Sequence, residues 1–436
     1  MYNAVVPVSC VNVVLDDDPT GVQAVHDVPV LLRWSAGSIR KASVTGARSI
    51  HLMTNIRALA PQQAEAKTFG AVAAALAALP ESRIVLRGDS TLRGHLREEY
   101  RAVHRAARSR TPPVLLLVPA LPAAGRVTLD GIHWITEGGR RLPLHETEYA
   151  RDGAFSYRTA RLLDWAEERT AGEIAAADGT ELSLAPLRAG GPAAVGEAIL
   201  RAAASGRPAA CAPDAETLED LAIIAKGLER AEAEGANVLV RCAPTFAGVL
   251  AGTLAEGFIP APQARERGLL IVCGSYVPGT SRQLAHLQQA MGINAVEPDI
   301  YALASEAPHA EVGRVAAIVR HHLTTRGVAL VSTPRERPAA LVTLDAGERI
   351  ARGLASVVAM LDPPPDVLIA KGGITSHVVL EHGLRVSEAR VAGPVAAGIA
   401  LWNVRSRGSD IAYLVFPGNV GGADHLTSVV SLVQGR

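Results

Sequence analysis

The sequence predicts an α/β protein with two domains, each built on a mainly parallel sheet flanked by helices. Short apolar runs recur along the 436 residues, and Ala-rich stretches separate many of them. Continuous apolar strands that alternate with helices are typical of parallel sheets covered on both faces. The length corresponds to two or three domains, and a hydrophobic content of 48% is enough for large cores.

The expected strands are the apolar, β-rich runs of the chain. They cover residues 11–15, 28–32, 50–53, 83–86, 113–118, 237–240, 269–273, 328–332, 366–370 and 411–416. Helices are expected over 61–79 and 281–291, which are rich in Ala, Gln and Leu.

The domain boundary is expected in GFIPAPQARERG, residues 257–268. This stretch places two prolines and several charges between a helical segment and the strand LLIVC. We therefore expect an N-terminal domain over residues 1–257 and a C-terminal domain over residues 268–436. The Ala-rich segment 150–260 has weaker strands and is assigned to the first domain.

Composition excludes several classes of function. Lys plus Arg and Asp plus Glu are equal at 43 each, and aromatic residues make up only 4%, so nucleic acid is not an expected partner. The N-terminus lacks a signal-peptide pattern, and no apolar stretch reaches the ~18 residues that span a bilayer. The four cysteines have no CxxC spacing and are expected to be buried, reduced thiols. Together these features predict a cytoplasmic protein without a membrane partner.

Unusual polar motifs come directly after the expected strands. DDDPTG, TNIRAL and RGDSTLRGH follow strands of the first domain, and GSYVPGTS, KGGITS and PGNVGG follow strands of the second. The carboxyl ends of strands form the ligand crevice of open α/β sheets. We therefore expect one group of functional loops in each domain, with an active site in the cleft between the domains.

The N-terminal loops are rich in carboxylates and guanidinium groups. DDDPTG is compatible with a strand-to-helix turn that carries an N-cap, but three aspartates supply more charge than a turn requires. Carboxylates at a strand end can accept a hydroxyl proton, bind sugar hydroxyls or help to hold Mg²⁺. Arginines in RGDSTLRGH and TNIRAL can bind carboxylate or phosphate, unless they form only a structural surface network. A small polyhydroxy acid fits these loops.

The C-terminal loops are rich in glycine, with Ser or Thr at expected helix starts. Such turns expose backbone N–H groups that bind phosphate well, although glycine in a strand-to-helix turn is often structural. Together the three loops favour a nucleotide or another phosphate ligand. GxxxxGK[ST], GxGxxG and GxSxG motifs are absent, and the histidines have no metal-ligand spacing, so no metal-binding residue is predicted.

In this order, the motifs resemble those of the four-carbon acid sugar kinases, long known as a domain of unknown function. The resemblance covers nearly the whole chain. Asp17, Asp18, Thr20 and Gly21 match Asp-Asp-x-Thr-Gly, and RGDSTLRG matches Lys-x-Asp-Ser-Thr-x-Arg-Gly with Arg87 in the lysine position. Further matches are a Gly-Ser turn and a Gly-Gly-x-Thr segment, at Gly274, Ser275, Gly372, Gly373 and Thr375.

The resemblance implies an ATP-dependent kinase of carbohydrate metabolism that phosphorylates the terminal hydroxyl of a tetronate-type acid. The N-terminal domain would bind the acid and the C-terminal domain the nucleotide. We predict that Asp17 orients or deprotonates the attacking hydroxyl, with Asp18 or Asp89 beside it. The expected substrate-binding residues are Asn55, Arg57, Arg87, Ser90, Thr91 and Arg93. Those expected to hold the phosphates of ATP, bridged by Mg²⁺, are Ser275, Gly372, Gly373, Thr375, Gly418 and Gly421.

Two other functions stay open at this point. The final loop, FPGNVGG, departs from the Lys-x-Gly-Asn-Phe-Gly of the family, which motivates a non-catalytic acid-sugar sensor that has lost phosphotransfer. A nucleotide-dependent dehydrogenase is a weaker alternative because its fingerprint is absent. The sequence does not distinguish threonate, erythronate and 3-oxo-tetronate, and a homodimer is expected only as a general possibility.

Overall fold

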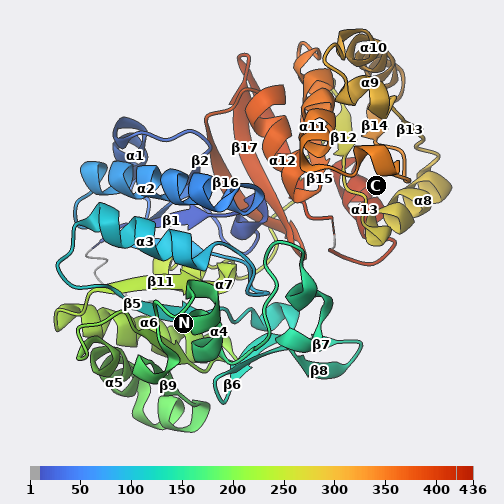
Figure 1. Ribbon diagram of the computed structural model, residues 1–436. Helices are drawn as coiled ribbons and strands as arrows, with labels where there is room; N and C mark the ends of the chain where they lie inside the picture. The colour runs from blue at the N-terminus through green and yellow to red at the C-terminus, as the bar shows by residue number, and fades with distance from the viewer. Residues whose placement is uncertain (1–9, 419, 436) are drawn as a thin grey trace. The chain divides into compact units, whose positions relative to one another are not determined.

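The computed structural model describes residues 10–418 and 420–435, which form two compact units (Figure 1). Unit 1 contains the residues up to Gly21 together with Arg33–Leu254, and unit 2 contains Val22–Leu32 together with the residues from Ala255. From the sequence, residues 22–32 are expected in the N-terminal domain. They group with unit 2 because β2 (Val28–Leu31) pairs antiparallel with β16 (Glu388–Ala396) of that unit.

Unit 1 has a parallel sheet in the order β3-β1-β4-β11-β5-β10-β9. All of its strands run in one direction, so their carboxyl ends lie at one edge. The strands are β1 (Asn12–Asp16), β3 (Ser49–Met53), β4 (Arg83–Arg87), β5 (Val114–Val118), β9 (Thr180–Leu182), β10 (Ala210–Pro213) and β11 (Val238–Cys242).

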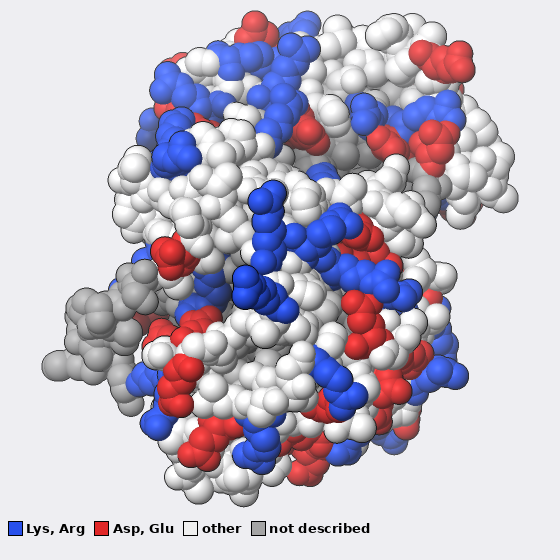
Figure 2. Space-filling view, turned by 60° about the vertical axis from the view of Figure 1, so that its left-hand side comes forward, with Lys and Arg blue, Asp and Glu red and all other residues white. Residues whose placement is uncertain are grey.

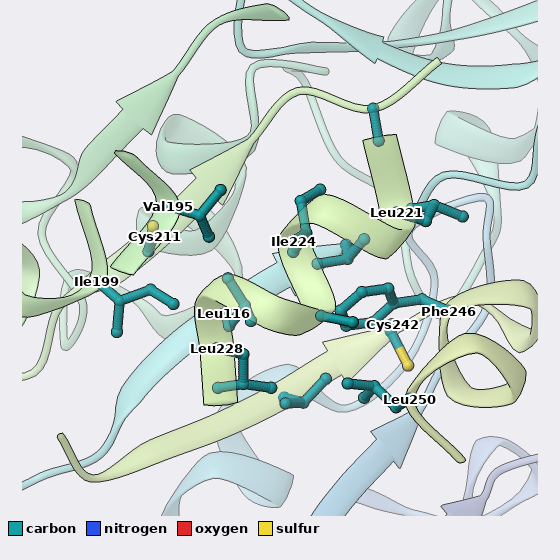
Figure 3. Close-up of a cluster of buried hydrophobic side chains, with 14 of the residues drawn as sticks. Leu116, Val195, Ile199, Cys211, Leu221, Ile224, Leu228, Cys242, Phe246 and Leu250 are labelled. Carbon is teal, nitrogen blue, oxygen red and sulfur yellow. The ribbon is translucent and has the colours of Figure 1, made fainter. Parts of the chain in front are cut away.

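Helices cover this sheet and bury its apolar side chains. They are α1 (Ala36–Ser43), α2 (Pro61–Ala78), α3 (Leu96–Ala107), α4 (Leu162–Thr170), α5 (Leu184–Ala203), α6 (Leu218–Ala233) and α7 (Pro244–Ala251). Figure 3 shows how α5, α6 and α7 pack their side chains against β5, β10 and β11. Leu116, Ile224 and Phe246 are completely buried there. This packed layer provides a rigid support for the loops at the sheet edge.

A small antiparallel sheet in unit 1 was not expected from the sequence. It consists of β6 (Arg126–Leu129), β7 (Ile132–Glu137) and β8 (Arg140–Pro143). Its strands are short and carry several charged residues, so they lack the apolar run used to recognise the others. Short turns, with Gly131 and Gly139 at positive φ, join the strands.

Unit 2 contains a mixed sheet in the order β13-β14-β12-β15-β18-β17-β16-β2. The pairs from β13 to β18 are parallel, and the remaining pairs are antiparallel. Besides β2 and β16, the strands are β12 (Leu269–Cys273), β13 (Ala295–Val296), β14 (Val328–Ser332), β15 (Val367–Lys371), β17 (Ile399–Ser406) and β18 (Ser409–Phe416). The helices are α8 (Pro278–Met291), α9 (Ile300–Ala304), α10 (His309–Arg326), α11 (Leu344–Ala359), α12 (Gly373–Val378) and α13 (His425–Val433).

The predicted fold class is confirmed: both units are α/β, with sheets that are mainly parallel. Every strand expected from an apolar run is present, within one or two residues of the expected bounds. Acidic and basic side chains are intermingled over the face shown in Figure 2, as the balanced composition predicts. Among the described residues, no helix is both long enough and apolar enough to cross a bilayer.

Candidate functional site

The carboxyl ends of β1, β3 and β4 bring the predicted loops of unit 1 together. Asp16, the last residue of β1, pairs with Met53 of β3 on one side and with Arg87 of β4 on the other. The loops that begin after these residues carry the aspartates and arginines predicted from the sequence. The parallel register therefore assembles one cluster of charged side chains from three separate segments.

Asp16 has a structural role. Its buried carboxylate lies 2.7 Å from Arg87 Nε and 2.6 Å from His51 Nδ1, both of which donate to it. Burial alone would raise its pKa, but the charges and hydrogen bonds of His51 and Arg87 outweigh burial and lower the pKa. The backbone carbonyl of Asp16 also accepts the N–H of Thr54 and Asn55, which fixes the start of the next loop.

Asp17 differs from its neighbours because its carboxylate is only partly satisfied. Its side chain is buried. Oδ1 forms an ion pair with Arg87 Nη1 at 3.0 Å, although not in the geometry of a hydrogen bond, and Oδ2 lies 3.7 Å from Arg57 Nε. Burial raises the pKa of Asp17, and the attraction of Arg57 and Arg87 only partly opposes it. A buried carboxylate with a raised pKa can accept a proton from a hydroxyl group.

Arg57 links the aspartates of two loops. Its guanidinium group donates to Asp18 Oδ2 at 2.5 Å and lies 3.4 Å from Asp89 Oδ2. It is carried by a short 3₁₀ turn, Ile56–Ala58, which begins after Asn55 in the left-handed conformation (φ 47°). Asn55 therefore shapes the loop through its backbone.

Arg87 was expected to contact the substrate, but its side chain is buried against the aspartate segment. It is 3% exposed and binds the carboxylates of Asp16 and Asp17 and the backbone carbonyl of Asp18. These contacts make it the residue that holds the aspartate segment in place.

The loop after β4 is organised around Asp89. Its carboxylate accepts the backbone N–H and the hydroxyl of Thr91 and lies 2.6 Å from Arg93 Nε. Burial opposes ionisation, but Arg57 and Arg93 outweigh it and hold the pKa of Asp89 well below its usual range. Asp89 is thus a permanent anion that positions arginines, whereas Asp17 is the better candidate base.

Several residues of this cluster were not singled out from the sequence. Arg126, the first residue of β6, donates to the hydroxyl of Ser90 at 2.5 Å. The ring of Tyr149 lies 5.3 Å from the Arg93 guanidinium and 5.8 Å from that of Arg126. Arg241 pairs with buried Glu99 and donates to the carbonyl of Arg93. These residues follow no recognisable motif, so only the folded structure reveals them.

The glycine-rich loops of unit 2 also meet at one edge. Cys273 of β12 pairs with Lys371 of β15, which pairs with Phe416 of β18, and all three strands are parallel to one another at this point. The loops that follow contain Ser275, Gly372, Gly373, Thr375, Gly418 and Gly421.

Close approaches explain why these loops require glycine. A Cβ on Gly274 would lie 2.5 Å from Thr375 Oγ1, and one on Gly418 would lie 2.5 Å from Ser275 Oγ. Gly372 has a φ of 112°, which L side chains rarely adopt. The backbones are therefore packed closely around Ser275 and Thr375, in the way that loops binding phosphate through N–H groups are built.

Two further side chains hold the last loop of unit 2 in place. Thr280 of α8 donates to the carbonyl of Gly418 at 3.0 Å, and Gln283 donates to the carbonyls of Val420 and Gly421 at 2.9 and 3.2 Å. Gly373 begins α12 next to this region. The structure thus brings together Ser275, Gly372, Thr375 and Gly418, with Gly421 farther along the same loop.

Lys371, the last residue of β15, belongs to none of the predicted sites. It is fully buried, donates to the carbonyl of Pro417 at 3.2 Å and lies 3.9 Å from the centre of the Phe416 ring. Burial lowers its pKa to about 8, and the positive charge of Arg335 acts in the same direction. In the described chain, no ion pair joins it to a carboxylate. A buried cation therefore lies directly below the glycine loops.

The described residues contain no group of three or more His, Cys, Asp or Glu side chains that could hold a metal ion. A metal that enters with the phosphates of a ligand needs only one or two carboxylates from the protein.

Known proteins match both units. A family model described as a sugar-binding N-terminal domain matches residues 12–250, and one described as a nucleotide-binding C-terminal domain matches residues 270–426. The chain is 28% identical over 311 residues to a D-threonate kinase of Salmonella typhimurium. That alignment covers 70% of this chain and 66%, slightly less than two thirds, of the kinase.

Solved structures share the fold. A structure titled as a putative tRNA synthase from Salmonella typhimurium has a TM-score of 0.72, and a Haemophilus influenzae protein of a domain-of-unknown-function family has a TM-score of 0.68. Each is 17% identical to this chain and covers 96% of it, over 98% and 99% of their own chains respectively.

Proposed function

Because the chain belongs to the four-carbon acid sugar kinase family, we propose that it is a kinase that transfers phosphate from ATP to the terminal hydroxyl of a four-carbon sugar acid. The observation that carries this proposal is Asp17. It is a buried carboxylate with a raised pKa that follows β1 directly, and it pairs with Arg57 and Arg87 among the loops predicted to bind the acid. The D-threonate kinase among the relatives supports the same substrate class.

Unit 1 would bind the acid and prepare its hydroxyl for attack. Asp17 would orient that hydroxyl and accept its proton, a role that typically contributes ~10²–10⁴ in rate. Arg57 lies closer to Asp18 and Asp89 than to Asp17, so it would stabilise the charge of those two carboxylates more and leave Asp17 as the base. Ser90, Thr91 and Arg93 would shape the rest of the acid site.

Unit 2 would bind the nucleotide through its backbone. The loops leave no room for a Cβ at Gly274 and Gly418, and Gly372 has a φ that favours glycine, which supports a cradle for phosphate groups. When bound, Mg²⁺ neutralises the phosphates and enters with the nucleotide. Lys371 would add positive charge below the loops and hold the Pro417 carbonyl in place.

The proposal is tested by incubating the purified protein with ATP, Mg²⁺ and a panel of four-carbon sugar acids, and by measuring ADP release and the phosphorylated acid. We expect ADP release that depends on one acid of the panel, with D-threonate the first to test. Binding of an acid without ADP release would instead support the sensor. Reduction of a nicotinamide cofactor in the presence of an acid would indicate a dehydrogenase.

A further inference from the structure

Arg126 stands apart from the other arginines of the unit 1 cluster because it has no acidic partner. Arg57, Arg87 and Arg93 each form ion pairs with at least two aspartates. Across the described residues, no ion pair joins Arg126 to a carboxylate. Its hydrogen-bond acceptor is a neutral one, the hydroxyl of Ser90. Arg126 is therefore a cation whose charge the cluster leaves uncompensated.

The guanidinium group of Arg126 also has an unused donor. Its Nε is buried and has no hydrogen-bond partner, although Nη1 is occupied by Ser90. Buried N–H groups in native proteins are almost always paired, so an orphan donor requires an explanation. A ligand with acceptor oxygens on this side of the guanidinium group would provide the missing partner.

Tyr149 strengthens this argument. The guanidinium groups of Arg93 and Arg126 both lie near its ring, at 5.3 and 5.8 Å from the centre. The ring attracts each cation, but it does not remove the repulsion between two positive charges gathered around it. Asp89 and Asp152 neutralise Arg93. An anion next to Arg126 would neutralise the second positive charge in the same way.

The backbone holds Arg126 at a fixed place beside the predicted active-site loop. Leu121 and Arg126 exchange backbone hydrogen bonds of 2.8 and 3.2 Å, and Gly125 makes the turn between them with a φ of 66°. On the other side, buried His133 lies with Nε2 2.9 Å from the carbonyl of Ser90. Arg126 is thus attached to the residue that directly follows Asp89, while Asp17 lies across Arg57 from Asp89.

We infer that Arg126, supported by Ser90 and Tyr149, binds the carboxylate of the sugar acid. This inference rests on the proposed function and replaces the expectation that Arg57, Arg87 and Arg93 supply that contact. Those three arginines already hold aspartates, and a substrate carboxylate would have to compete for them. An arginine with free donors can instead grip a carboxylate with two parallel hydrogen bonds. The carboxylate of the acid would then lie at Arg126, and the reacting hydroxyl would lie at Asp17.

The test compares acids with polyols that lack the carboxylate. Calorimetry would measure the affinity of the full-length protein for D-threonate, L-threonate and D-erythronate, and for the matching polyols threitol and erythritol. We expect the wild type to prefer the best acid over its polyol at least tenfold. Arg126→Met should lower the affinity for that acid about 10- to 100-fold and leave polyol binding unchanged, so that the preference disappears.

Control variants separate charge recognition from damage to the fold. Arg126→Lys keeps the positive charge but cannot make two parallel hydrogen bonds to a carboxylate. It should therefore recover part of the preference for the acid over the polyol. Arg158→Met removes an arginine whose side chain is 90% exposed and should change nothing. Should Arg126→Met fail to fold, as judged by circular dichroism, the same comparison is made with Arg126→Gln.

Two results would overturn the inference in distinguishable ways. If the wild type prefers an acid and the Arg126 variant keeps that preference, the carboxylate binds elsewhere while the proposed function stands. If the wild type binds none of the acids, both the inference and the proposed function fail.

Discussion

The predicted ligand-binding edges of the two units differ in the groups that form them. At the edge of unit 1, Asp16, Asp17, Asp89 and several arginines neutralise one another through side-chain ion pairs. At the edge of unit 2, the loops meet through glycine backbones, and Lys371 is buried with no acidic partner among the described residues. A buried cation thus has a different setting in each unit: Arg87 lies between two carboxylates, whereas Lys371 donates only to a backbone carbonyl among the described residues. Substitutions at the two edges should therefore differ in what they do to stability and to activity.

The largest effect is expected from Asp17→Asn. The amide has nearly the same shape but cannot accept the hydroxyl proton, so we expect kcat to fall about 10²–10⁴-fold with a normal circular dichroism spectrum. The matched control is Asp164→Asn, at an exposed position of α4, which should keep wild-type turnover. An unchanged kcat in Asp17→Asn would show that unit 1 does not use this residue as its base.

Arg87→Met should strongly destabilise unit 1. It removes the arginine that pairs with Asp16 and the closest cation of Asp17, and both carboxylates are buried. Breaking a buried pair in this way typically costs about 3–5 kcal/mol. Urea denaturation followed by circular dichroism measures the loss. A cost below 1 kcal/mol would mean that Arg87 is not the support of the aspartate segment.

Lys371→Met should increase the free energy of unfolding, whereas Arg87→Met should decrease it. The folded pKa of Lys371 is about 8, below its ordinary value of 10.5, so burial of the charge destabilises the fold at pH 7. Removal of the charge should stabilise the protein by about 1–2 kcal/mol, after allowance for the lost hydrogen bond to Pro417. Chemical denaturation at pH 7 measures the difference, and a large destabilisation would contradict it.

The same residue predicts a pH dependence with a defined direction. Between pH 8 and about 10.5, folded Lys371 loses its proton while the unfolded chain keeps it, so the contribution of Lys371 to stability rises with pH. The ammonium charge below the loops disappears over the same range, so we expect nucleotide affinity to fall as the pH rises through 8. Calorimetry with ATP and Mg²⁺ from pH 7 to 9.5 should detect this fall in the wild type, and Lys371→Met should not show it.

The smallest effect is expected from Gly418→Ala. The new Cβ would lie 2.5 Å from Ser275 Oγ, so the loop must shift, and we expect the KM for ATP to rise about tenfold while kcat changes less. Gly313→Ala in α10, where a Cβ meets no atom within 4 Å, is the control and should keep the wild-type KM. If both variants have the same KM for ATP, the loop at Gly418 does not bind the nucleotide.

The sequence predicted more of the fold than of the site. Apolar runs such as 269–273 and 411–416 identified their strands because parallel strands buried on both faces are apolar throughout. The strands β16 and β17 were missed because charged and exposed residues such as Arg390 and Asn403 interrupt their apolar pattern.

For the site, the sequence predicted which loops meet but not how their charges pair. The motif around residues 16–18 indicated a functional loop, yet only the register of β1 against β3 and β4 separates structural Asp16 from Asp17. Arg126 and Lys371 belong to no motif. Their importance depends on what surrounds them in space, and no local pattern encodes those neighbours.

The central claim is that unit 1 binds the acid and unit 2 the nucleotide. Hydrogen exchange read by mass spectrometry tests it directly, with the acid alone and with a non-hydrolysable ATP analogue and Mg²⁺ alone. We predict that the acid slows exchange in residues 54–59 and 88–95, and that the analogue slows it in residues 274–281, 372–376 and 417–422. Protection of the same unit by both ligands would contradict the account.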